Sequence, residues 1–326
     1  MLKKIGVVIL LVVILWGGIV VFARVRNPEK REMNEEARAG VPGQFVTLAD
    51  GVTHYDVAGP DTGSRVVLVH GFSVPYYIWD STSVALSKAG FRVARYDHFG
   101  RGYSDRPAVR YTARLYDRQL EQLLDSLGWR DPVHIVGLSM GGPVVAGFAA
   151  KHPERVKSLT LVDPAAGGDG GVPWYFKVPF FGRLLWQSLA VPSMADGQVS
   201  DFYEPQKWPD WADRYRPQVE FRGFGRALLS TRLESARGPR DGVYAQAGKT
   251  GVPALLIWGK EDQTVPIKFA DVVQKGIPQV QFHPIDRAGH LPHMERTDVV
   301  NPLLIAFLHS ADSAHTPKAD STKAAK

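Results

Sequence analysis

The sequence predicts an α/β fold in which a mostly parallel sheet is covered by helices on both faces. Short, continuous runs of Val, Ile and Leu alternate with amphipathic helical patterns, which is typical of buried parallel strands. The alternation is interrupted between residues 166 and 245, where no buried-strand pattern occurs. A charge-free apolar run near the N-terminus predicts a transmembrane helix ahead of this fold.

The N-terminal run extends from Ile5 to Phe22, with lysines before it and arginines after it. A helix of this length spans roughly 27 Å at 1.5 Å per residue, close to the ~30 Å core of a bilayer. We therefore expect residues 1–26 to form a single membrane anchor. A cleaved signal peptide is the alternative, because Val21-Phe22-Ala23 loosely fits a cleavage site.

The charges that flank the run conflict about its orientation. The N-terminal lysines favour a cytoplasmic N-terminus, whereas Arg24, Arg26, Lys30 and Arg31 argue for the reverse. We expect the globular part to be extracytoplasmic, and secreted if the segment is cleaved.

The remaining boundaries follow from composition. Residues 27–43 are polar and contain Pro28, Pro42 and Gly43, which predicts a linker. Residues 311–326 lack large apolar side chains, which predicts a disordered tail. The fold is then expected in two parts, residues 44–165 and 246–310, on either side of the interruption.

The elements of the fold can be assigned in chain order. A hairpin of residues 45–49 and 54–57 is expected around Asp50-Gly51. Six buried strands are expected at residues 66–69, 91–96, 133–136, 158–162, 254–258 and 280–285. Helices are expected at residues 79–89, 112–127, 140–152, 266–275 and 298–309.

The interruption, residues 166–245, contains 14 of the 34 aromatic residues of the chain, four of its eight tryptophans and seven prolines. We expect a helical lid inserted after the sixth strand. Most of its aromatic side chains should pack the lid against the fold, and a few should contact substrate.

The overall composition excludes several classes of protein. With 326 residues, 44% of them hydrophobic, the chain can bury a large core without covalent cross-links. The absence of cysteine excludes disulfides, thiolate metal sites and a cysteine nucleophile. The net charge of +6 is spread along the chain, so nucleic acid is not an expected partner.

A nucleophile is predicted in the segment GLSMGG, residues 137–142, which follows a strand and opens a helix. A serine on such a turn needs small residues two positions away on either side, and Gly137 and Gly141 meet this need. The turn would raise Ser139 above the sheet at a helix N-terminus, where N–H groups can stabilise an anion. A glycine-rich turn without catalysis is the alternative.

Serine needs a base within hydrogen-bond reach. His290 suits this role best, because it follows Ala288-Gly289 on the loop after the last strand. His70 is expected to brace the loop that contains Phe72. The other histidines considered are expected to be surface or packing residues: His98, His134, His152, His283 and His293.

The base needs a carboxylate to set its tautomer. Asp262 follows the strand at residues 254–258, at the carboxyl end where loops of such sheets build sites. Asp163, after the preceding strand, and Glu261 are the alternatives. No metal is expected, because the chain lacks an HExxH motif. No nucleotide cofactor is expected, because the serine occupies the glycine-rich turn.

The order Ser139, Asp262, His290 is the α/β-hydrolase order. The sequence resembles this superfamily from Gln44 to Ser310. The segments that carry the resemblance are VLVHGF, YDHFGRGYSDRP, GLSMGG, LVDPA, LLIWGKEDQTVP and DRAGHLPHMER.

The resemblance implies an oxyanion hole formed by the backbone N–H groups of Phe72 and Met140. It also implies that Asp97, Arg101 and Ser104 form a structural turn beneath the site.

The family pattern separates this chain from several members. Haloalkane dehalogenases and epoxide hydrolases place Asp at the position of Ser139, dienelactone hydrolases use Cys, and proline-iminopeptidase-like members usually have an aromatic residue where Met140 stands. The turn is similar to those of monoacylglycerol-lipase-like esterases, carbon–carbon bond hydrolases and cofactor-free haloperoxidases. The membrane helix and the aromatic lid look most like the membrane-anchored lipases.

The resemblance thus implies hydrolysis of lipid-like or aromatic carboxylic esters, small molecules that form an acyl-enzyme on Ser139. The same three residues could instead serve carbon–carbon bond hydrolysis, perhydrolysis or acyl transfer. A non-catalytic ligand-binding homologue is a further alternative.

Overall fold

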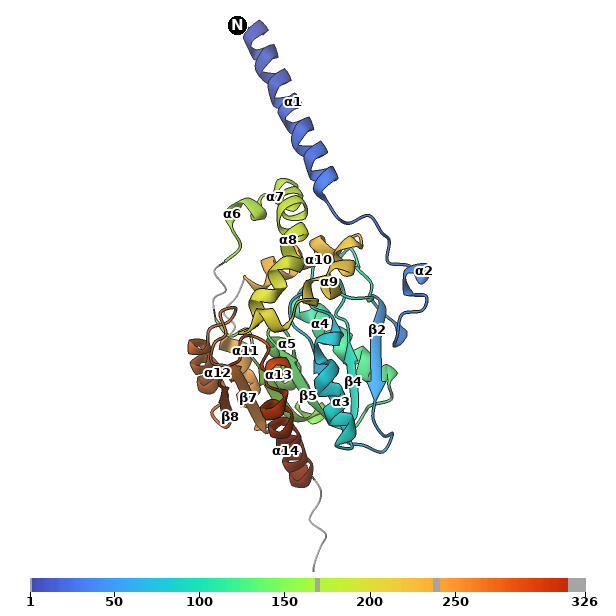
Figure 1. Ribbon diagram of the computed structural model, residues 1–326, viewed down its shortest axis with the longest axis vertical. Helices are drawn as coiled ribbons and strands as arrows, with labels where there is room; N and C mark the ends of the chain where they lie inside the picture. Colours follow the sequence, from blue (N-terminus) through green and yellow to red (C-terminus); the bar gives the residue numbers. More distant parts are fainter. Residues whose placement is uncertain (1, 168–170, 237–240, 316–326) are drawn as a thin grey trace, which may run out of the picture.

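The computed structural model describes residues 2–167, 171–236 and 241–315, and an eight-stranded sheet lies at its centre (Figure 1). The strands lie in the order β1-β2-β4-β3-β5-β6-β7-β8. Strand β2 pairs antiparallel with β1 and β4, and the other neighbours are parallel, which confirms the mostly parallel sheet. The strands are β1 (Gln44–Leu48), β2 (Gly51–Ala58), β3 (Arg65–Val69), β4 (Arg92–Tyr96), β5 (Val133–Leu138), β6 (Val156–Val162), β7 (Ala254–Gly259) and β8 (Gln281–Ile285).

Both faces of the sheet are buried. In β3, Val66 and Leu68 belong to one hydrophobic cluster, whereas Val67 and Val69 belong to the other, since consecutive side chains of a strand point to opposite faces. This two-sided burial explains the unbroken apolar runs of the inner strands.

Helices cover each face in turn. One face is covered by α3 (Asp80–Lys88) and α14 (Thr297–His315), with α13 (Pro292–Glu295) packed between them. The other is covered by α4 (Ala113–Ser126), α5 (Gly141–Lys151), α11 (Asp241–Gly248) and α12 (Ala270–Gly276).

A helical lid is inserted between β6 and β7, as the interruption of the strand pattern predicts. Figure 1 shows α6 to α9 between α1 and the sheet. Five large aromatic side chains of the lid are buried in the cluster of α3 and α14, namely Trp186, Phe202, Trp211, Tyr215 and Phe224. The lid helices are α6 (Trp174–Lys177), α7 (Phe181–Leu185), α8 (Val191–Gly197), α9 (Trp211–Tyr215) and α10 (Phe224–Ser235).

The structure moves two predicted boundaries. The helix α11 packs between α5 and α12 on the sheet, so the lid ends before this helix and not at Ala245. The last helix continues to His315, five residues past Ser310, because Ala311 is buried and Asp312 pairs with Lys157 at 2.7 Å. The rest of the predicted tail, residues 316–326, lies outside the described residues.

The polar segment of residues 27–43 is packed against the lid. The Glu29 carboxylate is buried and accepts hydrogen bonds from the N–H groups of Gly223, at 2.8 Å, and Gly225, at 2.6 Å. These groups lie at the start of α10, where backbone N–H groups lack partners within the helix. The segment therefore holds the lid in place and also connects α1 to the sheet. It contains one short helix, α2 (Glu35–Arg38).

The N-terminal segment forms one helix, α1 (Leu2–Arg26), which projects from the rest of the molecule (Figure 1). From Lys4 to Arg26 this helix is long and apolar enough to cross a membrane. Its second half contacts α7 and the π-helical turn Trp186–Ala190 of the lid.

Candidate active site

Ser139 lies on the tight turn between β5 and α5, with a positive φ of 52°. A Cβ atom on Gly137 would lie 2.5 Å from the Gly141 carbonyl oxygen, and one on Gly141 would lie 2.5 Å from that of Val69. Both neighbours must therefore be glycine. The positive φ of Ser139 is strained for a residue with a side chain, and it persists because the surrounding residues enforce it.

Two backbone hydrogen bonds hold this turn. The Ser139 N–H group donates to the Val162 carbonyl at 2.9 Å, and the Ala165 N–H group donates to the Ser139 carbonyl at 2.9 Å. Val162 is the last residue of β6 and Ala165 lies on the loop that follows it, so the neighbouring strand and its loop fix the position of the serine.

His290 and Asp262 form a buried pair, with 2.7 Å between His290 Nδ1 and Asp262 Oδ2. The other carboxylate oxygen of Asp262 accepts from the N–H groups of Thr264 and Val265, both at 2.8 Å. The carboxylate is thus held by the loop after β7, and it sets the orientation of the imidazole ring. Burial lowers the pKa of His290, but the Asp262 carboxylate outweighs burial, so the pKa of His290 is raised.

Ser139 and His290 line one cavity of about 240 Å³. Phe72 lines the same cavity, and Asp262 lies behind His290. Met140 follows Ser139 at the start of α5, with its side chain buried. The structure therefore gathers the five predicted site residues in one region, while the oxyanion role of the Phe72 and Met140 amides stays a prediction.

The lid supplies the part of the cavity wall that the sequence does not reveal. Met194, Gln198, Asp201 and Arg232 line the cavity, and the His290 N–H group donates to the Asp201 carbonyl at 2.7 Å. No motif distinguishes these residues from the rest of the lid, because their position depends on how the lid folds over the sheet.

Asp163, the first alternative to Asp262, lies close to the pair but has another role. It is fully buried, its φ is 41°, and its Oδ1 accepts from the Gly259 N–H group at 2.8 Å. Burial raises the pKa of Asp163 well above its ordinary value, and the charge of Asp262 raises it further. A neutral Asp163 beside an ionised Asp262 avoids placing two buried negative charges together.

The other alternative, Glu261, accepts from the Ala288 N–H group at 3.0 Å. Its carboxylate therefore positions the loop that leads to His290, while Asp262 makes the contact with the imidazole.

One oxygen or nitrogen of each of Asp163, Asp262 and His290 lies within 4.8 Å of the others, a spacing at which a cation could be held. However, His290 Nδ1 and Asp262 Oδ2 are 2.7 Å apart, which is a direct hydrogen bond. A proton, and not a metal cation, therefore lies between these two atoms in the structure.

His70 is buried under the loop that contains Phe72. Its Nδ1 lies 2.9 Å from the Gly71 carbonyl oxygen, and its Nε2 accepts from the His98 N–H group at 2.9 Å. One nitrogen donates and the other accepts, so the ring is neutral, and burial lowers the pKa of His70 to about 4. These contacts agree with the expected bracing role.

The segment with Asp97, Arg101 and Ser104 is a buried, hydrogen-bonded turn. Arg101 Nε donates to the Phe72 carbonyl at 2.8 Å, and Ser104 Oγ donates to the Asp97 carbonyl at 2.6 Å. The turn thus supports the same loop from below.

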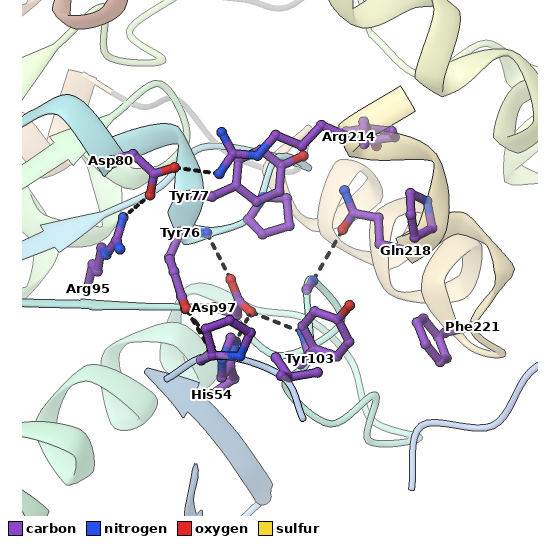
Figure 2. A pocket seen from close by; sticks show the side chains of 16 residues that line it. His54, Tyr76, Tyr77, Asp80, Arg95, Asp97, Tyr103, Arg214, Gln218 and Phe221 are labelled. Carbon is purple, nitrogen blue, oxygen red and sulfur yellow. Dashed lines mark hydrogen bonds and ion pairs between the residues drawn. The ribbon is translucent and has the colours of Figure 1, made fainter. Parts of the chain in front are cut away.

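A second cavity, of about 340 Å³, lies between the lid and the loop that follows β3 (Figure 2). Its charged groups neutralise one another: Asp80 accepts from Arg95 of the sheet and from Arg214 of the lid, and Asp97 accepts from His54. The guanidinium of Arg214 also lies over the Tyr77 ring, 4.1 Å from its centroid. These contacts join the lid to the sheet, and Ser139 does not line this cavity.

Comparisons with known proteins agree with this fold. The family model described as the alpha/beta hydrolase fold matches residues 64–297. A 2-hydroxy-6-oxononadienedioate/2-hydroxy-6-oxononatrienedioate hydrolase of Cupriavidus pinatubonensis is 31% identical, over 81% of this chain and 94% of its own length. Lipase 1 of Psychrobacter immobilis is 26% identical, over 84% of this chain and 86% of its own length. The solved structure of a meta-cleavage product hydrolase from Pseudomonas fluorescens has a TM-score of 0.70 at 25% identity, covering 82% of this chain and 98% of that one.

Proposed function

The chain belongs to the alpha/beta hydrolase fold family, and we propose that it hydrolyses carboxylic esters through an acyl-enzyme on Ser139. The observation that carries the proposal is the 2.7 Å hydrogen bond between His290 and Asp262, made at the cavity that Ser139 lines. A strained serine and a carboxylate-oriented histidine at one cavity form the constellation needed for nucleophilic catalysis.

In this mechanism, the Ser139 hydroxyl attacks the ester carbonyl while His290 takes its proton. The proton goes to Nε2, because Nδ1 is engaged by Asp262. The Asp262 carboxylate stabilises the imidazolium that forms. The N–H groups of Phe72 and Met140 would hold the oxyanion, and the alcohol leaves with a proton from His290. Water activated by His290 then releases the acid and restores Ser139.

The cavity favours an ester with an apolar part. Six apolar side chains line it, namely Phe72, Val74, Ile78, Leu138, Met194 and Leu291. The similarity to Lipase 1 supports a lipid-like substrate. We assign α1 as a membrane anchor, with the catalytic part extracytoplasmic; cleavage of a signal peptide remains the competing explanation of the same helix.

The test is hydrolysis of p-nitrophenyl esters from acetate to palmitate by the full chain in detergent. Ser139→Ala should reduce turnover by a factor on the order of 10⁴ to 10⁶. Ser193→Ala, at an exposed lid serine, is the matched control and should leave the rate unchanged. The proposal fails if Ser139→Ala retains the wild-type rate, or if wild type turns over no ester and does not react with a fluorophosphonate.

Carbon–carbon bond hydrolysis is the second candidate, favoured by the 31% identical hydrolase named for a dicarboxylate. Arg232 lines the cavity, and within the described residues no carboxylate forms an ion pair with it. Its guanidinium could therefore bind a substrate carboxylate.

This candidate predicts turnover of a 2-hydroxy-6-oxo-dienoate that exceeds turnover of any ester. Arg232→Gln should then raise KM for the dienoate about 10-fold or more while leaving a neutral ester unaffected. Faster ester turnover, with no selective effect of Arg232→Gln, would reject it.

A further inference from the structure

We propose that the lid tip, residues 171–190, lies in the lipid bilayer beside α1, so that the catalytic cavity receives its substrate from the membrane. The inference rests on the proposed role of α1 as an anchor. It adds a second membrane-contacting surface and names an amphiphilic, membrane-resident ester as the substrate class.

The composition of the lid tip suits the headgroup and upper acyl region of a bilayer. From Gly171 to Ala190 the chain contains no acidic residue, and its only charged side chains are Lys177 and Arg183. Aromatic residues are enriched where proteins meet the membrane interface, and basic side chains are attracted to anionic lipids there. The aromatic side chains of the tip are Trp174, Tyr175, Phe176, Phe180, Phe181 and Trp186.

Trp186 is buried in the lid and Phe176 packs against it, but the other apolar side chains of the tip are largely left to solvent. Phe180 is 85% exposed, Trp174 is 75% exposed and Leu189 is 48% exposed, and Tyr175 and Val178 are also exposed. Outside α1 and the lid tip, the exposed large hydrophobic residues of the described chain are scattered singly, at Val84, Val109, Tyr203 and Val299. A gathered apolar surface on one segment indicates an interaction site, whereas scattered ones do not.

The contact with α1 places the tip at membrane depth. The rings of Trp16 and Phe181 are stacked, with 6.2 Å between centroids. Trp16 precedes Arg24 by eight residues, or about 12 Å along a helix. If α1 crosses the bilayer, Phe181 must lie at the depth of Trp16, inside the apolar layer. The exposed faces of α6 and α7 then contact lipid, since both helices lie near the C-terminal end of α1 in Figure 1 and α7 contacts α1 directly.

Phe180 has a backbone conformation that fits this role. Its φ of 59° and ψ of −53° lie outside the regions favoured by residues with a side chain. The strain holds a phenylalanine almost entirely outside the protein. Strained conformations cluster at positions that contact a ligand or partner, and the exposed Phe180 side chain contributes nothing to the core.

The lid connects this surface to the catalytic cavity. A continuous run of helix and π-helical turn leads from Phe181 through Trp186–Ala190 to Met194. Met194 follows Phe181 by thirteen positions, or roughly 20 Å along a helix, and it lines the cavity of Ser139. The substrate class that fits a membrane-contacting lid connected to this cavity is an amphiphile with one ester near its headgroup, such as a monoacyl lipid.

The first experiment measures the depth of the tip in the full chain, reconstituted in phosphatidylcholine–phosphatidylglycerol liposomes. Because the chain has no cysteine, Phe180→Cys and the control Val84→Cys each offer one site for an NBD label. Lipids brominated on the acyl chain should quench the label at position 180 several-fold more than that at 84, and aqueous iodide should show the reverse. Equal quenching at both positions overturns the proposal. Protection of the label at position 180 from both quenchers also overturns it, because such protection indicates contact with protein.

The second experiment measures delivery of substrate. The double variant Trp174→Glu/Phe180→Glu should lose about tenfold of its turnover of a monoacyl lipid ester in liposomes, while p-nitrophenyl acetate turnover is unchanged. The control Val84→Glu should change neither. A proportional loss on both substrates, or no loss on either, contradicts the inference. The quenching experiment needs no turnover, so failure of the ester hydrolase proposal is distinguished from failure of this one.

Discussion

His54 Nδ1 lies 2.7 Å from Asp97 Oδ2, the same separation that joins His290 to Asp262. The two pairs differ in what surrounds Nε2, the ring nitrogen that does not contact the carboxylate. His54 Nε2 lies 2.9 Å from the Pro42 carbonyl oxygen, so both ring nitrogens face acceptors and the ring is an imidazolium. His290 uses Nδ1 for Asp262 and lines the cavity of Ser139. One histidine–aspartate pair therefore holds the structure together, and the other is poised to move a proton.

The pair of His54 and Asp97 makes the free energy of unfolding decrease both at high pH and at low pH. Burial lowers the pKa of His54, but the Asp97 carboxylate outweighs it, and the net pKa is raised. Burial raises the pKa of Asp97, but His54 outweighs it, and the net pKa is lowered. The His54 contribution is complete below about pH 6.5 and is lost as pH rises through the raised pKa. The Asp97 contribution is complete above about pH 4 and is lost as pH falls through the lowered pKa.

Asp97→Asn should therefore lower the free energy of unfolding by about 3–5 kcal/mol near pH 6, because it leaves His54 buried without its charge partner. Urea unfolding of the full chain in detergent between pH 5 and 9 measures this. Asp61→Asn, which removes a largely exposed partner of Arg92, is the control and should cost less than about 1 kcal/mol. Equal effects of the two variants would show that the buried pair is not stabilising.

Asp262→Asn should impair turnover and change its pH dependence. His290 acts as a base only when neutral, so activity falls as pH drops through its raised pKa. Removing the Asp262 charge should lower that pKa and shift the acid limb of kcat/KM to lower pH. Loss of the correct tautomer should reduce kcat by a factor on the order of 10³ to 10⁴. An unchanged acid limb would show that another group titrates.

Asp163→Asn should stabilise the protein at neutral pH. Folding keeps a proton on Asp163 that the unfolded chain releases above about pH 4, so the wild-type free energy of unfolding falls as pH rises, by about 1.4 kcal/mol per pH unit. Asn is neutral, nearly isosteric and tolerant of the φ of 41°. Unfolding curves from pH 4 to 7 should lose this slope in the variant. A variant that is less stable at every pH would argue for an ionised Asp163.

Glu29→Gln should loosen the lid, because Glu29 accepts from the N–H groups of Gly223 and Gly225 at the start of α10. We expect a loss of about 1–2 kcal/mol in the free energy of unfolding, together with faster proteolysis of the lid. The matched control is Glu32→Gln, whose ion pair with Arg222 is exposed and should contribute little. If Glu29→Gln and Glu32→Gln were proteolysed at the same rate, Glu29 would not contribute to holding the lid.

Local pattern was sufficient for most of the fold. Each apolar run that predicts a strand is a strand of the sheet, because strands covered on both faces are built mainly of apolar residues, although the edge strand β8 is only partly buried. The turn around Ser139 could be identified for the same reason, since the two glycines that the turn requires are adjacent in sequence. The C-terminal boundary of the lid could not be identified from the sequence, because the helical pattern of α11 does not reveal that this helix packs against α5 and α12.

The sequence by itself determined the parallel sheet, the inserted lid, the apolar N-terminal helix and the candidacy of Ser139, Asp262 and His290. Tertiary structure decided which carboxylate bonds His290, since Asp163 and Asp262 both end neighbouring strands and differ only in their three-dimensional contacts. It also decided that Glu29 holds the lid and that Phe181 lies beside Trp16. Periodicity and turn chemistry act between neighbours along the chain, whereas these choices depend on distances between residues far apart in it.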